Sequence, residues 1–233
     1  MATKTTTSTT SSKTNKPKAG EGMDTNREMW LRFRVTLQVD GPFGASIPKT
    51  PDEIRAMLEN RMPGKMPDGA TPIGELVEQV IEEVGASDEF LPGGATFKRD
   101  AQGLYYEGRN VRGHLKDCAL QVAPFFPAIG AFRAKVANKT YVETDRIVLG
   151  KAEPDGTIQR FIQVMTRQGP RSSIKYVDYI ENPKLVFVMR LLNDGVVTEK
   201  VLRRIFEYGG THGIGAERSQ GWGRYTLEGM EAL

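Results

Sequence analysis

The chain has one cysteine and two histidines among its 233 residues. A single cysteine, Cys118, excludes an internal disulfide bond and is typical of a reducing compartment. The same three residues are too few for the usual zinc sites. No apolar run approaches the ~18 residues that a membrane-spanning helix needs, and the N-terminus has no apolar signal core. These absences predict a cytoplasmic protein with no membrane partner.

Positive and negative charges almost balance. The 32 Lys and Arg residues oppose 29 Asp and Glu residues, which leaves a net charge of +3. Proteins that bind duplex nucleic acid through charge alone are usually more basic than this. We therefore expect the basic residues to be concentrated in patches.

Residues 1–26 form a low-complexity segment dominated by Thr, Ser and Lys. Such a composition buries too little surface to offset the entropy lost on ordering, so we predict a disordered tail. Two interpretations of it are open: a solubilising leader, or a basic arm that contacts RNA or a neighbouring subunit. We expect one domain over 27–233.

The pattern at 30–39 is a ten-residue alternation of apolar and polar side chains. It predicts a half-buried strand whose odd positions face the core. Arg32 and Arg34 then lie on the open face, where they suit RNA laid across a sheet or are simply solvated.

Residues 41–98 are predicted to be an insertion that carries two helices. Proline at a helix start and acids in the first turn predict a helix at 51–60, and apolar spacing predicts another at 72–84. The second helix is acidic, with Glu75, Glu78, Glu82 and Glu83. We expect it to face a basic partner and not RNA.

The rest of the chain predicts an α+β fold. We expect a short strand or a hairpin at 97–106, a helix at 110–122, a helix capped by Thr198, and strands at 141–149, 157–167, 173–179, 184–192 and 222–227. The order strand, helix, strands, helix, strand is a ferredoxin-like (RRM-like) plan with a helical insertion.

The segment 209–225 holds six glycines, two arginines, a histidine, a tryptophan and a tyrosine. Glycines let backbone approach a ligand, exposed amides bind anions, and arginine forks suit phosphate. The segment lacks the Lys-Ser/Thr of a P-loop, and it follows a helix instead of opening one. It indicates binding to nucleic acid; a flexible C-terminal connection is the alternative.

Two segments resemble the RAMP superfamily, the RNA-binding proteins of CRISPR systems. Residues 213–225 resemble its C-terminal glycine-rich loop, which has a glycine pair, then Arg-Ser-x-Gly-x-Gly-Arg/Lys and an aromatic residue. Residues 107–117 resemble a segment that opens the first helix of the backbone subunits. The resemblance implies a protein that binds single-stranded guide RNA and assembles with copies of itself and other effector subunits.

Backbone subunits also carry a protruding β-hairpin that kinks guide RNA. The hairpin expected at 144–166, with its turn at 154–156, is the candidate for that role; an ordinary core hairpin is the alternative. From the strand, the hairpin and the two segments, the candidate RNA-binding residues are Arg32, Arg34, Arg109, Asn110, Arg112, Lys116, Arg160, Arg171, Gly213, Gly215, Arg218, Ser219, Gly221, Trp222, Gly223 and Arg224.

Two different catalytic chemistries are open. His114 and His212 can act as base and acid in metal-independent RNA cleavage if the fold brings them together, with support from Tyr105, Tyr106 or Lys116. Alternatively, both only form hydrogen bonds. Asp40 matches by topology an acid that cuts target RNA with a divalent metal in type III backbone subunits. A turn residue is the other interpretation, and no other cofactor is expected.

Three functions therefore follow from the sequence. The first is a guide-RNA-binding backbone subunit of a ribonucleoprotein effector complex. The second is a metal-independent endoribonuclease that processes CRISPR transcripts. The third is a scaffold or inhibitor protein of the same fold that docks through 41–98.

Overall fold

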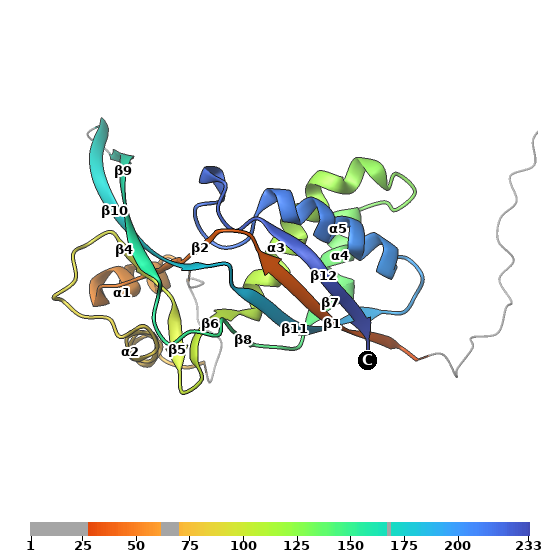
Figure 1. Cartoon of the computed structure of the whole chain (residues 1–233), viewed down its shortest axis with the longest axis horizontal. Helices are drawn as coiled ribbons and strands as arrows, with labels where there is room; N and C mark the ends of the chain where they lie inside the picture. Colours follow the sequence, from red (N-terminus) through yellow and green to blue (C-terminus); the bar gives the residue numbers. More distant parts are fainter. Residues whose placement is uncertain (1–27, 62–69, 167–168) are drawn as a thin grey trace, which may run out of the picture.

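The computed structural model describes residues 28–61, 70–166 and 169–233, and it has a mixed α+β architecture (Figure 1). The predicted tail at 1–26 lies outside the described residues. No helix in the described ranges is long and apolar enough to cross a membrane.

A four-stranded antiparallel sheet forms the first layer. Its strand order is β12 (Tyr225–Ala232), β1 (Trp30–Val39), β11 (Lys184–Leu192) and β7 (Thr140–Val142). The strand predicted at 30–39 is confirmed, and Val35 lies opposite Phe187 and Met230 in the core. Arg32 and Arg34 are exposed on the open face, as the alternation predicted.

Three helices, α3 (Gly108–Val122), α4 (Phe132–Lys139) and α5 (Glu199–His212), pack together on one side of this sheet (Figure 1). A short 3₁₀ helix, η1 (Ala123–Phe125), follows α3. The cap predicted for α5 is confirmed, because the Thr198 hydroxyl accepts a hydrogen bond from the Val201 amide at 3.4 Å. Phe187 from β11 and Phe206 from α5 are both fully buried in the shared core.

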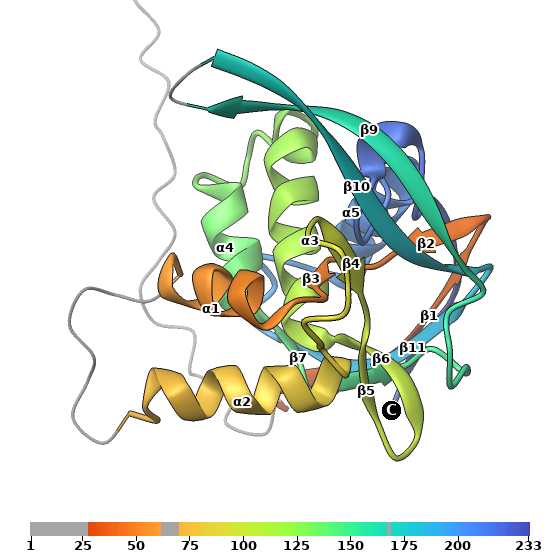
Figure 2. The ribbon, with the colours of Figure 1, turned by 90° about the vertical axis from the view of Figure 1, so that its left-hand side faces the viewer.

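A second sheet combines three short strands from the chain between β1 and α3 with two long strands from the chain between α4 and β11. Its order is β2 (Pro42–Gly44), β10 (Gly169–Glu181), β4 (Gly94–Thr96) and β3 (Ile47–Pro48), and β9 (Gly156–Thr166) pairs with β10. The helices α1 (Pro51–Glu59) and α2 (Ile73–Val84) lie beside each other below it (Figure 2) and share a core of Ile54, Val77, Val80 and Val84. Both helices match their predictions to within a residue or two.

A third sheet contains β5 (Lys98–Asp100), β6 (Gly103–Glu107) and β8 (Arg146–Val148). Of the two alternatives predicted at 97–106, a short strand or a hairpin, the structure has the hairpin, which is β5 and β6. The single strand predicted at 141–149 is instead two short strands in different sheets, because the chain crosses from β11 to β6 within this segment.

The predicted 144–166 hairpin has the wrong pairing. β8 pairs with β6, while β9 pairs with β10 in a long antiparallel ribbon that extends away from the helices (Figures 1 and 2). The turn residues 154–156 lead into β9, and the Asp155 carboxylate accepts a hydrogen bond from the Glu181 amide at 2.7 Å. Residues 167–168, between the two strands of the ribbon, lie outside the described residues.

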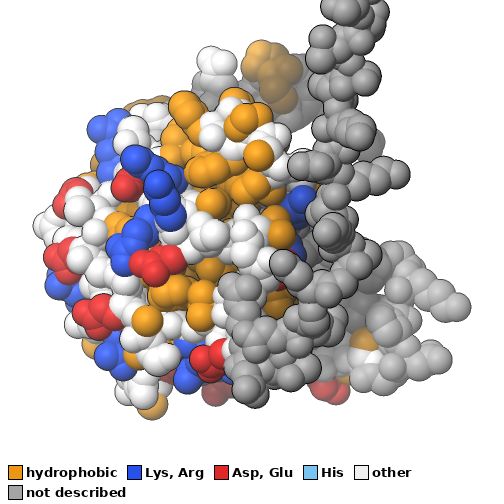
Figure 3. All heavy atoms as spheres, turned by 90° about the vertical axis from the view of Figure 1, so that its right-hand side faces the viewer, with side chains coloured by type: hydrophobic (Ala, Val, Ile, Leu, Met, Phe, Trp, Pro, Cys, Tyr) orange, Lys and Arg blue, Asp and Glu red, His pale blue; other side chains and the backbone are white. Residues whose placement is uncertain are grey.

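The surface remote from the ribbon has apolar character. Figure 3 faces this end of the molecule and shows hydrophobic side chains gathered between basic and acidic ones. The described chain leaves several large hydrophobic side chains exposed, among them Phe125, which is 81% exposed. Exposed apolar surface of this kind is typical of contacts between proteins when it is contiguous.

Candidate nucleic-acid interface

One groove contains residues of both segments that resemble the RAMP superfamily. We call it the α3–loop groove. Its lining residues come from α3, from the glycine-rich loop after α5, and from two positions nearby: Arg109, Asn110, Gly113, His114, Asp117, Ile214, Gly215, Arg218, Ser46 and Tyr106. The fold therefore brings together two segments that lie about a hundred residues apart in the sequence.

The glycine-rich loop is closely packed against the chain that follows β1. The Ile214 amide donates to the Gly223 carbonyl at 2.8 Å, and the Gly223 amide donates to the Pro42 carbonyl at 2.9 Å. A Cβ on Gly223 would lie 1.8 Å from the Ile214 carbonyl oxygen, and the φ of Gly223 is +68°. Only glycine satisfies both constraints. This packing does not fit a flexible connection.

The loop amides serve this packing more than they serve a ligand. The amides of Gly213, Gly221 and Gly223 all donate to backbone carbonyls of the protein. These three amides are therefore engaged within the folded chain, and RNA binding at these glycines stays a prediction. The positive φ angles of these glycines bend the backbone, and the bends determine where the side chains of the intervening residues point.

Arg218 is the side chain that this loop directs toward the groove. It opens the 3₁₀ turn η2 (Arg218–Gln220) and is exposed. Its Nη1 donates to Nε2 of His212 at 2.9 Å and lies 3.7 Å from an Asp117 carboxylate oxygen. Two neighbours thus orient the guanidinium, while most of its donors stay open to an oxyanion.

His114 and His212 do come together, as nuclease chemistry would require. Their ring centroids are 6.1 Å apart. His114, however, is only 5% exposed, and its Nε2 is bonded to the Tyr225 hydroxyl at 2.9 Å. Burial, with the nearby charges of His212 and Arg218, lowers the pKa of His114 to about 3. A histidine that is neutral at pH 7 cannot act as the general acid there.

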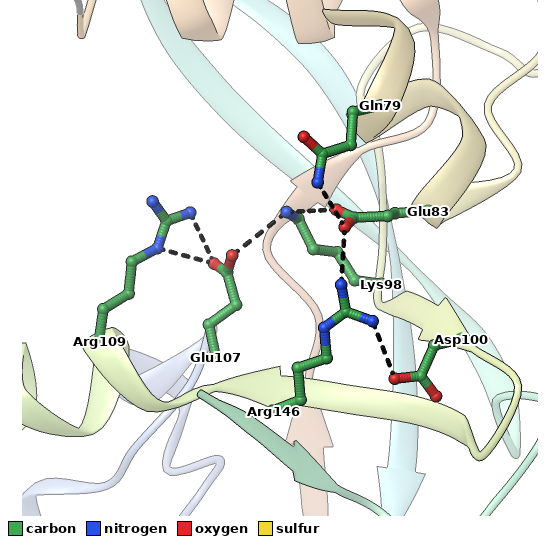
Figure 4. Close-up of polar contacts among 7 residues, drawn as sticks. All are labelled: Gln79, Glu83, Lys98, Asp100, Glu107, Arg109 and Arg146. Atoms are coloured by element: carbon green, nitrogen blue, oxygen red, sulfur yellow. Dashed lines mark hydrogen bonds and ion pairs between the residues drawn. The ribbon is translucent and has the colours of Figure 1, made fainter. Parts of the chain in front are cut away.

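Arg109 is held by its neighbour in the first turn of α3. Its Nε and Nη2 both donate to one Glu107 oxygen, at 2.9 and 2.7 Å. The other Glu107 oxygen lies 3.2 Å from Lys98 (Figure 4). Asn110, the next predicted residue, lines the groove beside Arg109.

Several other predicted cations lie away from the groove. Arg112 donates to the Ala137 carbonyl at 2.8 Å and stacks over Tyr141, so it faces α4 and β7. Lys116 is exposed on α3 but does not line the groove.

Arg32, on the open sheet face, forms an ion pair with Glu143, whose pKa is lowered to about 2 by hydrogen bonds from Arg32 and Arg190. Arg34 lies across from Glu231 on that face.

Trp222 has no open ring face for a base. It is 8% exposed, and the Arg160 guanidinium lies 5.4 Å above its ring while Tyr179 meets it edge-on. In this structure the ring packs the ribbon against the loop. A contact of Trp222 with RNA stays a prediction. A Lys175–Glu217 ion pair at 2.7 Å joins the same two elements. Arg171, near the ribbon tip, is exposed.

The remaining predicted positions lie around the loop. Ser219 and Arg224 are exposed, and the Arg224 carbonyl accepts a hydrogen bond from the Asp40 amide at 2.8 Å. The Asp40 carboxylate accepts one from the Thr226 hydroxyl at 3.3 Å. Among the described residues, no three His, Cys, Asp or Glu side chains converge as metal ligands, so a metal-dependent role of Asp40 stays a prediction.

Sequence reasoning missed Ser46 and Asp117 as groove residues and considered Tyr106 only as support for a histidine. Tyr106 immediately precedes the 107–117 segment, which was a usable signal. Burial raises the pKa of its hydroxyl, so the group stays protonated. Ser46 carries no such signal, because the backbone bridge between Gly44 and Ala216 determines its position.

Comparisons with known proteins place this chain in no family. No family model and no curated protein matches it. One solved structure that it is similar to is a chain of the type III-B Cmr-beta complex bound to cognate target RNA, with a TM-score of 0.39 and 11% identity. The match covers 88% of this chain and 61% of that chain, so this chain spans about three fifths of the neighbour's length. A likeness this distant carries no functional argument.

We predict that Gly223→Ala destabilises the protein far more than Gly41→Ala. Both glycines have positive φ, but a Cβ at Gly41 meets nothing within 4 Å. Gly41→Ala should cost ~1 kcal/mol for the backbone strain alone. Gly223→Ala adds an overpacking cost on the order of 3 kcal/mol. Urea unfolding measures both; equal losses would show that the loop relaxes freely.

We predict that the buried histidine makes the protein less stable at mildly acidic pH. Because the folded pKa of His114 lies below the unfolded value, its contribution is complete above ~6.5 and is lost as pH falls toward 3. At pH 5 the loss is ~2 kcal/mol. Urea unfolding at pH 7.5 and pH 5 should show this difference for the wild type. His114→Phe combined with Tyr225→Phe should remove it, and parallel pH dependence in the two proteins would contradict the assignment.

Proposed function

We propose that this chain binds single-stranded RNA in the α3–loop groove, as a backbone subunit of a CRISPR-type ribonucleoprotein complex. One observation carries the proposal: the two segments that resemble the RAMP superfamily line the same groove. Nothing in the separate sequence patterns requires them to meet. A shared binding surface explains why both are present.

The chemistry of the groove suits an RNA backbone. Arg218 presents an oriented fork that can bind two phosphate oxygens at once. Asn110 and Ser46 line the same groove and supply amide and hydroxyl groups that can bind a 2′-hydroxyl or a base edge. Arg109 adds a second cation at its α3 side.

The arrangement of the first sheet supports a ferredoxin-like classification. Along the chain its parts run β1, α3, β7, β11, α5, β12, and the two outer strands of the sheet are β12 and β7. This is a strand–helix–strand repeat with both helices on one face. In this proposal the β9–β10 ribbon is the protruding hairpin of the fold.

Assembly with copies of itself and with other effector subunits is part of the proposal. Head-to-tail contacts of one surface with a different surface generate filaments. The ribbon exposes Phe161 and Met165, and the opposite end of the molecule exposes apolar side chains (Figure 3). These two surfaces are the candidates for such contacts.

We infer binding without cleavage by the histidine pair. His114 is buried and neutral, and its Nε2 is engaged by Tyr225. His212 accepts a hydrogen bond from Arg218 and thereby orients the guanidinium that binds phosphate in this proposal. Both histidines then support the binding site.

The test is a titration of labelled single-stranded RNA over a salt series in chelator, with the same samples run on a denaturing gel. Arg218→Ala should weaken binding about tenfold and reduce the salt slope by about one, because one phosphate contact is lost. Intact RNA on the gel would support binding without cleavage.

Arg133→Ala is the matched control, since it removes the same charge from an exposed site on α4 that does not line the groove. Equal effects of the two variants would contradict the groove assignment. Cut RNA would favour the nuclease, and absent RNA binding would favour the scaffold or inhibitor.

A further inference from the structure

A chain of ion pairs leads from the insertion helix α2 to the edge of the α3–loop groove (Figure 4). Glu83 on α2 binds the Lys98 ammonium at 2.7 Å, and Lys98 lies 3.2 Å from Glu107. Glu107 in turn binds Arg109 through its second oxygen at 2.7 Å. One lysine therefore joins two carboxylates, one of which holds a groove residue.

Lys98 is not a surface lysine. Its side chain is 10% exposed, and the side chains of Glu83 and Glu107 are 13% and 18% exposed. Ion pairs this sheltered are screened far less by salt than surface pairs are. Loss of one partner leaves a charge uncompensated inside the protein, so the remaining groups must rearrange or pair differently.

At the α2 end of this series of ion pairs, further polar contacts hold Glu83 in place. Gln79 donates to one Glu83 oxygen at 3.1 Å, and Arg146 lies 3.5 Å from the same oxygen while also contacting Asp100 (Figure 4). Burial acts to raise the pKa of Glu83, but the hydrogen bond and charge of Lys98 outweigh it, and the pKa is lowered. The acidic helix α2 thus meets basic residues of its own chain.

At the groove end of this series of ion pairs, Glu107 and a ligand compete for Arg109. Its side chain is 68% exposed, so solvent and ligands can reach it. Glu107 is divided between Lys98 and Arg109, one oxygen for each. The nearby ammonium draws part of the carboxylate's charge, and this weakens the hold of Glu107 on Arg109. A phosphate can then compete for the guanidinium.

We propose that Lys98 is a positioning residue for RNA binding, which couples α2 to Arg109 through Glu107. Lys98 does not line the groove itself, and neither does any residue of α2. Without Lys98, Glu107 pairs with Arg109 alone. The carboxylate then holds the Arg109 guanidinium more strongly and neutralises its charge, so that Arg109 is less available to RNA. The inference rests on the proposed function, because RNA affinity is its readout.

The first experiment is a double-mutant cycle read by RNA affinity at fixed salt. Lys98→Met should weaken binding of labelled single-stranded RNA about fivefold. In an Arg109→Ala background the same substitution should change affinity by less than about twofold, because its effect passes through Arg109. Combining Lys98→Met with Glu107→Gln should restore affinity by releasing the guanidinium. A purely structural role of Lys98 predicts no such restoration.

The control is Lys49→Met. Lys49 is a second sheltered lysine, paired with Asp178 at 2.8 Å, with side-chain exposures of 17% and 5%. It does not contact Glu107 or line the groove. Its removal should lower thermal stability comparably and leave RNA affinity within about twofold of the wild type. An equal loss of RNA affinity in both lysine variants would overturn the inference.

A second variant keeps the proposal testable if Lys98→Met does not fold. Glu107→Gln leaves Lys98 paired with Glu83 and should by itself strengthen RNA binding severalfold, with a steeper salt slope. Unchanged or weaker binding by Glu107→Gln would overturn the coupling while the Arg218 result still stands. Absent RNA binding by the wild type would overturn the proposed function, and the inference with it.

Discussion

The close backbone approach within the glycine-rich loop is the constraint on which the site depends. The amide–carbonyl bonds from Ile214 to Gly223 and from Gly223 to Pro42 leave no space for side chains at the crossing point. Because the backbone is held there, Arg218 is directed outward and Trp222 inward. The loop is a rigid support for one cation, and its glycines are needed for packing before they are needed for a ligand.

A polar pair inside the core links this loop to the helices. His114 on α3 and Tyr225 at the start of β12 share a hydrogen bond, and Gly209 on α5 leaves the space that both occupy. A Cβ at Gly209 would lie 2.2 Å from the Tyr225 hydroxyl oxygen. Three elements are thereby fixed around one neutral imidazole. The same burial that makes this histidine a good structural group makes it a poor proton donor.

Many basic side chains of the protein form ion pairs with particular carboxylates. Arg32, Lys98 and Lys175 are all ion-paired with carboxylates of distant segments. Such pairing links the parts of the fold electrostatically. The insertion between β1 and α3 is therefore connected to the groove by charge as well as by the backbone, which a separate docking module would not need.

The sequence by itself determined the local elements and the chemistry of the loop. Alternation at 30–39, the Thr198 cap and the apolar spacing of 72–84 are local signals, and the strand and the helices follow them closely. The glycine and arginine pattern of the loop pointed to Arg218, which lines the groove, and its contact with RNA stays a prediction. The predictions of strands and helices succeed because periodicity and capping act over a few residues.

Tertiary structure decided which partners these elements meet. The pairing of β8 with β6 and of β9 with β10 depends on segments far apart in the chain, and no local pattern encodes it. Helical spacing places Arg109 and Arg112 on α3, but only the neighbouring elements send one to the groove and the other to α4. Burial of Trp222 and His114 likewise results from packing around them, because exposure is a property of the assembled fold.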